Sequence, residues 1–323
     1  MQLRSLCVKF PMVIYIISDG KKGHLSQTRG LAQALLARAE QQIPDGAHAC
    51  HEIDVSQMGF FAKLTYRGKN LSYPRPSLIL CAGHGTHLAA LQLARAMHCP
   101  CMVCMKPSLP LRCFSLCIIP RHDYAPGTAK PDHVLLTHGA INAIVPQPEV
   151  EKKETLLLIG GPSKEFGWDE DYILTQLTTI TRYNTGQMTL TTSRRTPPDF
   201  VQALEAMCPS IRIEPVETTG PTWVADHLAT AKEVWVTQDS VSMVYEALSS
   251  GAPVGIIEMP VHPKRAGKAP SRVARGLAQL VEEGYVNTFT HWAKDHVLTP
   301  GPPLHEAARA ADYILTQFPK LLS

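Results

Sequence analysis

Two short polar segments in the second half of the chain carry groups that suit a diphosphate. Gly160-Gly161-Pro162-Ser163 predicts a tight turn whose backbone N–H groups can approach an anion, although tight turns also use glycine for geometric reasons alone. In Ser193-Arg194-Arg195, two adjacent guanidinium groups can clamp a diphosphate through forked, charge-assisted hydrogen bonds. The alternative interpretation of Arg194 and Arg195 is a solvated surface pair.

A third segment, residues 234–260, combines a strand, a turn and a helix in a way that favours anion binding. Asp239 and Ser240 have side chains that can cap a helix, and apolar residues recur at helical spacing after them. The N-terminus of such a helix presents unpaired N–H groups and a positive dipole, which attract phosphate. Glu246 lies one turn beyond Ser242, about 6 Å further along the axis, where its carboxylate could bind ribose hydroxyl groups. The alternative is a capped crossover helix with an exposed glutamate.

In the first half, Asp19 and His24 belong to a charged, glycine-containing loop between an expected strand and an expected helix. Either residue could act as general base on an acceptor hydroxyl group, and histidine is suited by a pKa near neutrality. The alternative is a histidine that only caps the helix or faces solvent. The loop has neither the G-x-G-x-x-G spacing of a dinucleotide site nor a Walker lysine–serine pair, so neither fingerprint is predicted.

All these loops follow expected strands, and the carboxyl ends of parallel strands form the ligand-binding edge of an open α/β sheet. The strand and helix patterns occur in two sets, separated by the polar, proline-containing segment 146–153. We therefore expect two Rossmann-like α/β domains facing a cleft, residues 1–146 and 147–323, with the last helix packing back on the N-terminal domain. The expected strands are 13–18, 51–55, 77–82, 100–105, 116–119, 133–137, 139–145, 155–159, 187–191, 211–216, 234–237 and 253–257.

The composition is that of a soluble globular protein, with 323 residues, 45% of them hydrophobic, 18% charged, and a net charge of +3. Because this charge is mild and no basic run is interleaved with aromatic residues, we expect no nucleic-acid partner. No segment approaches a transmembrane length. The apolar stretch near the N-terminus is interrupted by Lys9 and Pro11 and no small-residue cleavage site follows, so we expect a cytoplasmic location without a signal peptide.

Nine cysteines raise the question of zinc, but Cys101 and Cys104 lie in one apolar run and Cys117 in another, as in packed strands. We expect these cysteines to be packing residues rather than zinc ligands or disulfides. Four loop residues of the first half are further candidates for the ligand-binding edge: His84, His87, His122 and Asp123. They lack the spacing of a metal site, and no metal is predicted.

Residues 60–69 begin with Phe60 and Phe61 and contain basic groups at Lys63, Arg67 and Lys69. Aromatic and cationic side chains in one short segment are typical of contact with an anionic bilayer, although one such patch binds weakly. The segment predicts a peripheral contact with the inner face of a membrane. Such a contact would also bring a transferase to a lipid-linked acceptor.

Five motifs resemble one family, in order and over nearly the whole chain: Asp19-Gly20-(x)2-Gly23-His24, Pro120-Arg121-His122-Asp123, Gly160-Gly161-Pro162-Ser163, Ser193-Arg194-Arg195-Thr196-Pro197 and Val236-Thr237-Gln238-Asp239-Ser240-Val241-Ser242-Met243. It is the mitochondrial-fission "elongated mitochondria" family, whose bacterial members are described as glycosyltransferases. That family is similar to the GT-B superfamily, with the N-acetylglucosaminyltransferase MurG as a distant analogue. The resemblance implies a nucleotide-sugar bound chiefly by the C-terminal domain and an acceptor approached by the N-terminal one.

The resemblance also implies roles for single residues. Glu246 would hold the ribose, and His24 occupies the place of a histidine in the first glycine loop of MurG-like enzymes. The implied phosphate ligands are Gly160, Gly161, Ser163, Ser193, Arg194, Asp239 and Ser240.

The leading hypothesis is a metal-independent GT-B glycosyltransferase with a nucleotide-sugar donor, no cofactor, and a membrane-associated, lipid-linked or cell-envelope glycan as acceptor. A base in the N-terminal loop would deprotonate the acceptor, while the helix dipole, Arg194 and Arg195 stabilise the departing diphosphate. A non-hydrolysing nucleotide-sugar epimerase would share the architecture, with Asp19 and Asp123 as acid–base groups. The third hypothesis is a non-enzymatic peripheral membrane adaptor, which the family name favours.

Overall fold

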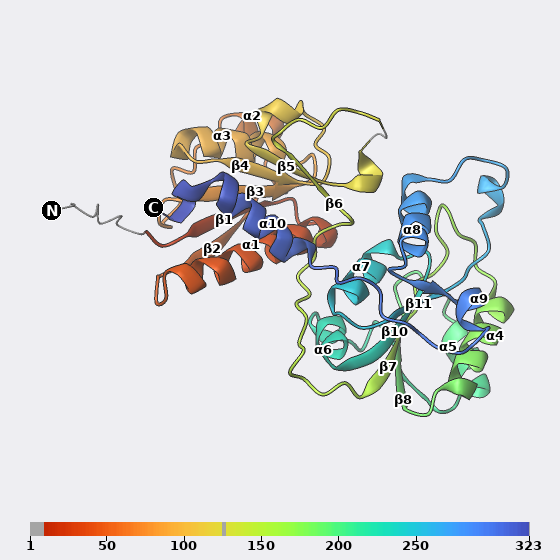
Figure 1. Ribbon diagram of the computed structural model, residues 1–323. Coiled ribbons are helices and arrows are strands. Elements are labelled where there is room, and N and C mark those ends of the chain that lie inside the picture. The colour runs from red at the N-terminus through yellow and green to blue at the C-terminus, as the bar shows by residue number, and fades with distance from the viewer. Residues whose placement is uncertain (1–9, 125–126, 323) are drawn as a thin grey trace. The chain divides into compact units, whose positions relative to one another are not determined.

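The computed structural model describes residues 10–124 and 127–322, and their contacts divide the chain into two units. Unit 1 comprises residues 1–143 and 305–323, and unit 2 comprises residues 144–304. Each unit contains a six-stranded parallel sheet flanked by helices (Figure 1). The expected α/β class with two Rossmann-like units is confirmed. Residues 1–9, where we expect no signal peptide, lie outside the described residues.

The sheet of unit 1 has the strand order β2-β1-β3-β4-β5-β6. The order reverses between β1 and β3, so the loops after these strands flank the crevice in which doubly wound sheets bind ligands. The last helix, α10, belongs to this unit and lies beside α1 (Figure 1). The elements of unit 1 are β1 (Val13–Ser18), α1 (Lys22–Gln42), β2 (Ala49–Asp54), α2 (Phe60–Leu64), β3 (Leu78–Ala82), α3 (His87–Met97), β4 (Cys101–Cys104), η1 (Leu111–Cys113), β5 (Leu116–Pro120), η2 (Arg121–Asp123), β6 (Val134–Thr137), α10 (Glu306–Gln317) and η4 (Pro319–Leu322).

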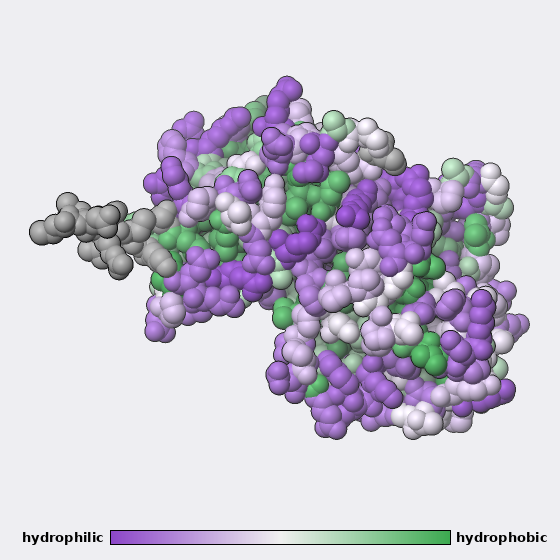
Figure 2. Space-filling view, viewed as in Figure 1, coloured by the Kyte–Doolittle hydropathy of each residue, from purple (hydrophilic) through white to green (hydrophobic). Residues whose placement is uncertain are grey.

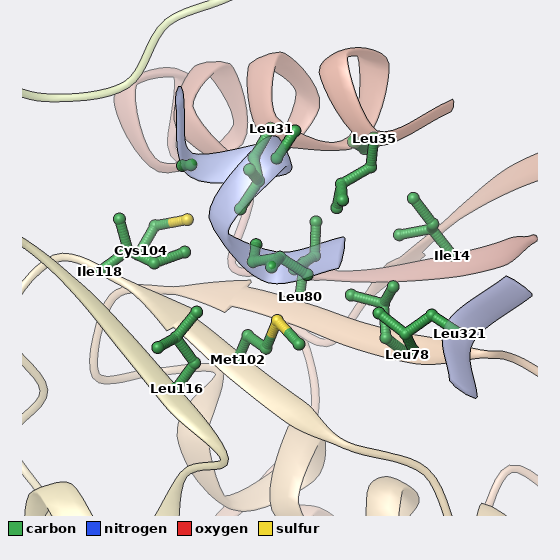
Figure 3. Packing of buried hydrophobic residues seen from close by; sticks show 14 of the residues in the cluster. Ile14, Leu31, Leu35, Leu78, Leu80, Met102, Cys104, Leu116, Ile118 and Leu321 are labelled. Atoms are coloured by element: carbon green, nitrogen blue, oxygen red, sulfur yellow. The ribbon is translucent and has the colours of Figure 1, made fainter. Parts of the chain in front are cut away.

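Strand alternation distributes the apolar side chains of unit 1 over two cores, one on each face of its sheet. Ile14 of β1 joins the core that contains side chains of α1 and α10, whereas Tyr15 joins the core that contains side chains of α3. Figure 3 shows the first of these cores, where Leu31 and Leu35 of α1 lie over apolar side chains of the strands. The two cores hold β1 and β3 rigidly, and with them the loops at their ends.

The sheet of unit 2 has the order β12-β11-β10-β7-β8-β9, which reverses between β7 and β10. The loops after β7 and β10 therefore flank the crevice of this unit. Its elements are β7 (Glu154–Leu158), α4 (Glu170–Tyr183), β8 (Gln187–Thr191), α5 (Phe200–Met207), β9 (Ile211–Glu214), α6 (Trp223–Thr230), β10 (Ala231–Thr237), α7 (Val241–Ser249), β11 (Val254–Ile257), η3 (Pro263–Arg265), α8 (Arg272–Glu282), β12 (Asn287–Thr288) and α9 (Phe289–Trp292).

The expected strands are present with small shifts at their ends, except the strand at 139–145, which is wrong. Ile141 packs in the core under α1 instead, so its apolar character reflects packing rather than strand pairing. The sequence pattern does not predict β12, α9 and α2, which have two, four and five residues. Elements this short leave no periodic pattern to detect.

The three cysteines of the apolar runs are packing residues, as expected. Cys101 and Cys104 are buried in the two opposite cores of unit 1, and Cys117 lies in the same core as Cys101. All described cysteines are free thiols. No group of three or more His, Cys, Asp and Glu side chains within residues 10–124 and 127–322 is arranged to hold a metal ion.

Hydrophilic residues cover most of the surface of each unit that is visible in Figure 2. Of the helices in the described part of the chain, none combines the length and the apolar character that crossing a membrane requires.

Candidate functional site

The loops after β7, β8 and β10 meet at the carboxyl edge of the unit 2 sheet. The Gly160 N–H donates to Thr237 Oγ1 at 2.7 Å, and the Gly161 N–H donates to Asp239 Oδ2 at 3.1 Å. The Thr196 hydroxyl donates to the Gly160 carbonyl at 2.5 Å. The structure therefore brings together the three segments that the sequence singles out for phosphate binding.

Glycine is needed in the first of these loops because the neighbouring loops pack against its backbone. A Cβ on Gly160 would lie 2.3 Å from the Asp239 carboxylate oxygens, and one on Gly161 would lie 2.2 Å from the Arg195 carbonyl oxygen. These distances are far below van der Waals contact. Packing of the protein on itself thus accounts for both glycines without a ligand.

Arg195 and Asp239 form an ion pair inside this cluster. Arg195 Nη2 lies 2.6 Å from Asp239 Oδ2, and Arg195 Nη1 donates to the carbonyl groups of Gly161 and Pro162, each at 3.1 Å. The Asp239 side chain has no exposed surface, and within the described part of the chain its Oδ1 has no hydrogen-bond partner. Asp239 thus neutralises Arg195, and Arg195 links the loops after β7, β8 and β10; phosphate binding by these two residues stays a prediction.

Arg194 remains available to a ligand. Its side chain is exposed, and no hydrogen bond or ion pair involves it among residues 10–124 and 127–322. Of the two adjacent arginines, Arg195 is therefore ion-paired with Asp239, and Arg194 offers its guanidinium group to a ligand.

Helix α7 begins shortly after Asp239, the acidic residue of the ion pair. Ser240 is its N-cap but makes no side-chain capping bond, and the first N–H in the helix with an intrahelical acceptor is that of Val244, which donates to Ser240 O at 3.1 Å. The N–H groups of Val241, Ser242 and Met243 precede this bond and have no acceptor among the residues that the structure describes, and the helix dipole adds positive potential at this end. Ser242 is exposed in this first turn.

Glu246 lies one turn further along α7 and is half-buried. Burial raises the pKa of its carboxyl group to about 7. No hydrogen bond or ion pair of this carboxyl group is found in the part of the chain that the structure describes. A carboxyl group near half-protonation and without a partner can both donate to and accept from hydroxyl groups.

The two serines expected to bind phosphate also stabilise their own turns. Ser163 Oγ accepts the N–H groups of Glu165 and Phe166 at 3.2 and 2.9 Å, and Ser193 Oγ accepts the Arg195 N–H at 3.2 Å. A hydroxyl group that accepts can still donate its own hydrogen, so Ser163 keeps a donor for an anion. The Ser193 hydroxyl lies 3.3 Å from Thr196 Oγ1, whose own hydrogen is donated to Gly160 O, so Ser193 donates to Thr196.

In unit 1, Asp19 and His24 form a pair at the crevice between β1 and β3. His24 Nδ1 lies 3.0 and 3.1 Å from the two carboxylate oxygens of Asp19, whose side chain is 7% exposed. Burial raises the pKa of Asp19, but the hydrogen bond and charge of His24, with a smaller effect of Lys21, outweigh it, and the net pKa is lowered. The carboxylate thus holds Nδ1, and Nε2 is the nitrogen that can take a proton.

The loop after β3 packs on this pair, and sequence analysis did not predict that role. Gly83 has a φ of +83°, and a Cβ there would lie 2.3 Å from the His24 ring. The sequence signal that could have indicated this role is the glycine-containing segment Gly83-His84-Gly85, directly after an expected strand. Of the two histidines here, His84 is exposed, whereas burial lowers the pKa of His87 to about 4 and Ser108 Oγ lies 3.3 Å from its Nδ1. His87 is therefore a neutral packing residue.

A cavity of about 910 Å³ lies at the other edge of the unit 1 sheet. It is lined by residues at the beginning of β1, β3 and β4, including Val13, Ser77 and Pro100, and by Phe318 near the C-terminus. Ligands of doubly wound sheets bind at the carboxyl ends of the strands, so this cavity does not belong to the candidate site.

The sequence pattern of a family described as Mitochondrial fission ELM1 matches residues 22–318. The chain belongs to this family. The resemblance drawn from the five motifs is thereby confirmed. Over an alignment of 305 residues, this family member is 25% identical to the mitochondrial fission protein ELM1 of Arabidopsis thaliana, covering 81% of the chain and 67% of that protein.

Solved structures similar to this ELM1-family chain include the following two. A Listeria monocytogenes protein, provisionally assigned as UDP-N-acetylglucosamine 2-epimerase, matches with a TM-score of 0.60 and 11% identity over 96% of this chain and 97% of its own. MurG of Acinetobacter baumannii matches with a TM-score of 0.49 and 11% identity over 96% of this chain and 100% of its own. At such identity the Listeria structure shows the fold alone, which is GT-B-like.

Proposed function

We propose that this ELM1-family protein is a metal-independent GT-B glycosyltransferase that transfers a sugar from a nucleotide-sugar to a hydroxyl acceptor. The observation that carries the proposal is the Asp19–His24 pair. A histidine whose Nδ1 is held by a buried carboxylate has the tautomer and orientation of a general base, with Nε2 directed to the proton it takes.

In the proposed reaction, the acceptor oxygen attacks the anomeric carbon of the sugar and its proton passes to Nε2 of His24. The bond between the anomeric carbon and the phosphate oxygen breaks, and the nucleoside diphosphate leaves with the electron pair. The Asp19 carboxylate stabilises the imidazolium ion that forms. The charge that grows on the diphosphate would be met by the free N–H groups of α7 and by Arg194, while Glu246 binds the ribose.

The name of the Listeria protein, which shares the fold, refers to the nucleotide-sugar UDP-N-acetylglucosamine, and this supports the proposed donor class. We propose as acceptor a lipid-linked or cell-envelope glycan, and as location the cytoplasm at the inner face of a membrane. The exposed Phe60 and Phe61 of α2 support an acceptor on a membrane.

Thermal unfolding of the full-length protein with UDP, GDP or CMP tests the proposal. We expect the melting temperature to rise with one nucleotide, with and without EDTA, and to rise less for Arg194→Ala. Sugar transfer from the matching nucleotide-sugar should then depend on His24. Unchanged melting temperatures with every nucleotide would contradict the proposal.

An epimerase is the second candidate, because the Listeria protein is provisionally assigned that activity. Product analysis with a nucleotide-sugar and no acceptor separates the two reactions, since only an epimerase would convert the sugar under these conditions. The family name favours a third candidate, a non-enzymatic peripheral membrane adaptor. Full cellular function of Arg194→Ala and Glu246→Ala proteins would support the adaptor.

A further inference from the structure

Helix α2 presents three large apolar side chains to solvent. Phe60, Phe61 and Leu64 are 63%, 79% and 40% exposed, and no residue of α2 is buried. The two phenyl rings lie edge to face, with centroids 5.7 Å apart. They form a projecting aromatic pair rather than part of a core, and such a group of exposed apolar side chains indicates a surface that a partner covers.

The loop after α2 places two cations beside the aromatic pair. Arg67 and Lys69 are exposed, and neither takes part in a hydrogen bond or ion pair among residues 10–124 and 127–322. Both line a cavity of about 540 Å³, together with Tyr66 and Asn70. Two positive charges with an amide and a hydroxyl group suit a phosphate-bearing head group.

The segment of the chain that contains α2 is also poor in acidic residues. Residues 55–122 contain no Asp or Glu, so all 28 acidic residues lie outside this segment. The segment includes α2 and α3, which lie side by side (Figure 1). Its basic residues are Lys63, Arg67, Lys69, Arg75, Arg95, Lys106, Arg112 and Arg121. This segment therefore carries an excess of positive charge, which attracts an extended anionic partner.

The α2 surface also lies near the Asp19–His24 pair. The Ser56 side chain, just before α2, would lie 3.8 Å from a Cβ on Gly20, the residue after Asp19. Asp54 interacts electrostatically with both Asp19 and Lys63. A partner that covers α2 is therefore brought close to the candidate base.

We propose that α2 and residues 66–71 dock unit 1 onto a bilayer that contains anionic phospholipids. Phe60 and Phe61 enter the boundary between head groups and acyl chains, and Arg67 and Lys69 bind lipid phosphates. A bilayer offers an apolar layer directly beneath a layer of phosphate groups, which matches an aromatic pair flanked by cations. Docking needs neither nucleotide nor catalysis, so the docking proposal can be tested independently of the proposed transferase activity.

Co-sedimentation of the full-length protein with vesicles tests this proposal. Vesicles of phosphatidylcholine mixed with an equal amount of phosphatidylglycerol are compared with pure phosphatidylcholine, at low and high salt. We expect binding to the anionic vesicles that high salt weakens. Phe60→Ser with Phe61→Ser should lower vesicle affinity at least tenfold, and Arg67→Gln with Lys69→Gln should remove the preference for anionic vesicles.

Matched controls separate docking from folding and from the proposed reaction. Lys264→Gln with Lys268→Gln removes the same charge from unit 2 and should bind vesicles as the unchanged protein does. His24→Ala should also bind normally. The proposal is overturned if the unchanged protein ignores anionic vesicles, if it binds membranes only when another protein is present, or if the α2 variants bind as tightly as the controls.

Discussion

Arg195 Nη2 lies 2.6 Å from Oδ2 of the buried Asp239 carboxylate, although 44 residues separate the two in the chain. The pair ties the loop after β8 to the loop after β10, and the Gly161 N–H joins it from the loop after β7. Arg194, which directly precedes Arg195 in the chain, is exposed. Two adjacent arginines therefore have different roles: one maintains the shape of the crevice, and the other can meet a ligand.

We predict that Arg195→Ala destabilises the protein by about 2 kcal/mol, because it leaves a buried carboxylate without its counter-charge. Arg195 itself is 43% exposed, so water compensates part of the loss. Arg194→Ala is the matched control and should change the stability by less than about 0.5 kcal/mol. Urea denaturation measures both variants, and equal effects would contradict the separate roles.

Removing the charge of Asp19 should impair transfer without unfolding the protein. Asp19→Asn keeps a group of the same size beside His24 Nδ1 but does not stabilise an imidazolium ion, so we expect kcat to fall by about 10²- to 10⁴-fold. His24→Ala should have an effect at least as large. Circular dichroism and nucleotide binding serve as controls for folding, and a kcat for Asp19→Asn close to that of the unchanged enzyme would exclude the assigned role.

Glu246 should make the protein less stable as pH rises. Its folded pKa of about 7 lies above the value of 4.5 for an unperturbed glutamate. Between these values the folded state binds the proton and the unfolded state does not, so stability is lost as pH rises through about 7. The loss is about 3 kcal/mol. Glu246→Gln should therefore be more stable than the unchanged protein at pH 8 and equally stable near pH 4, and identical pH profiles would refute the burial of this carboxyl group.

Gly83→Ala should disturb the Asp19–His24 pair directly. Its Cβ would overlap the His24 ring, and its φ of +83° adds backbone strain. We expect a loss of about 3 kcal/mol or a displaced histidine. Gly251→Ala is the matched control, because Gly251 has a φ of +81° but no atom of the described residues lies within 4 Å of its Cβ position. It should cost only about 1 kcal/mol, and thermal unfolding compares the two.

The sequence determined the order of the longer strands and helices, because apolar periodicity reflects which face of each element is buried. It also located the polar loops at the carboxyl ends of the strands, as in Gly160-Gly161 after β7 and Asp19 after β1. These are local properties, and each can be read within one stretch of the chain.

Only the tertiary structure decided which of these polar groups are already paired. The sequence cannot show that Arg195 rather than Arg194 meets Asp239, or that Gly83 approaches His24, because these contacts join residues that are far apart in the chain. The pKa of Glu246 and the exposure of Phe60 likewise depend on what packs around them. Burial and charge pairing arise from distances in space, which the spacing of residues along the chain does not encode.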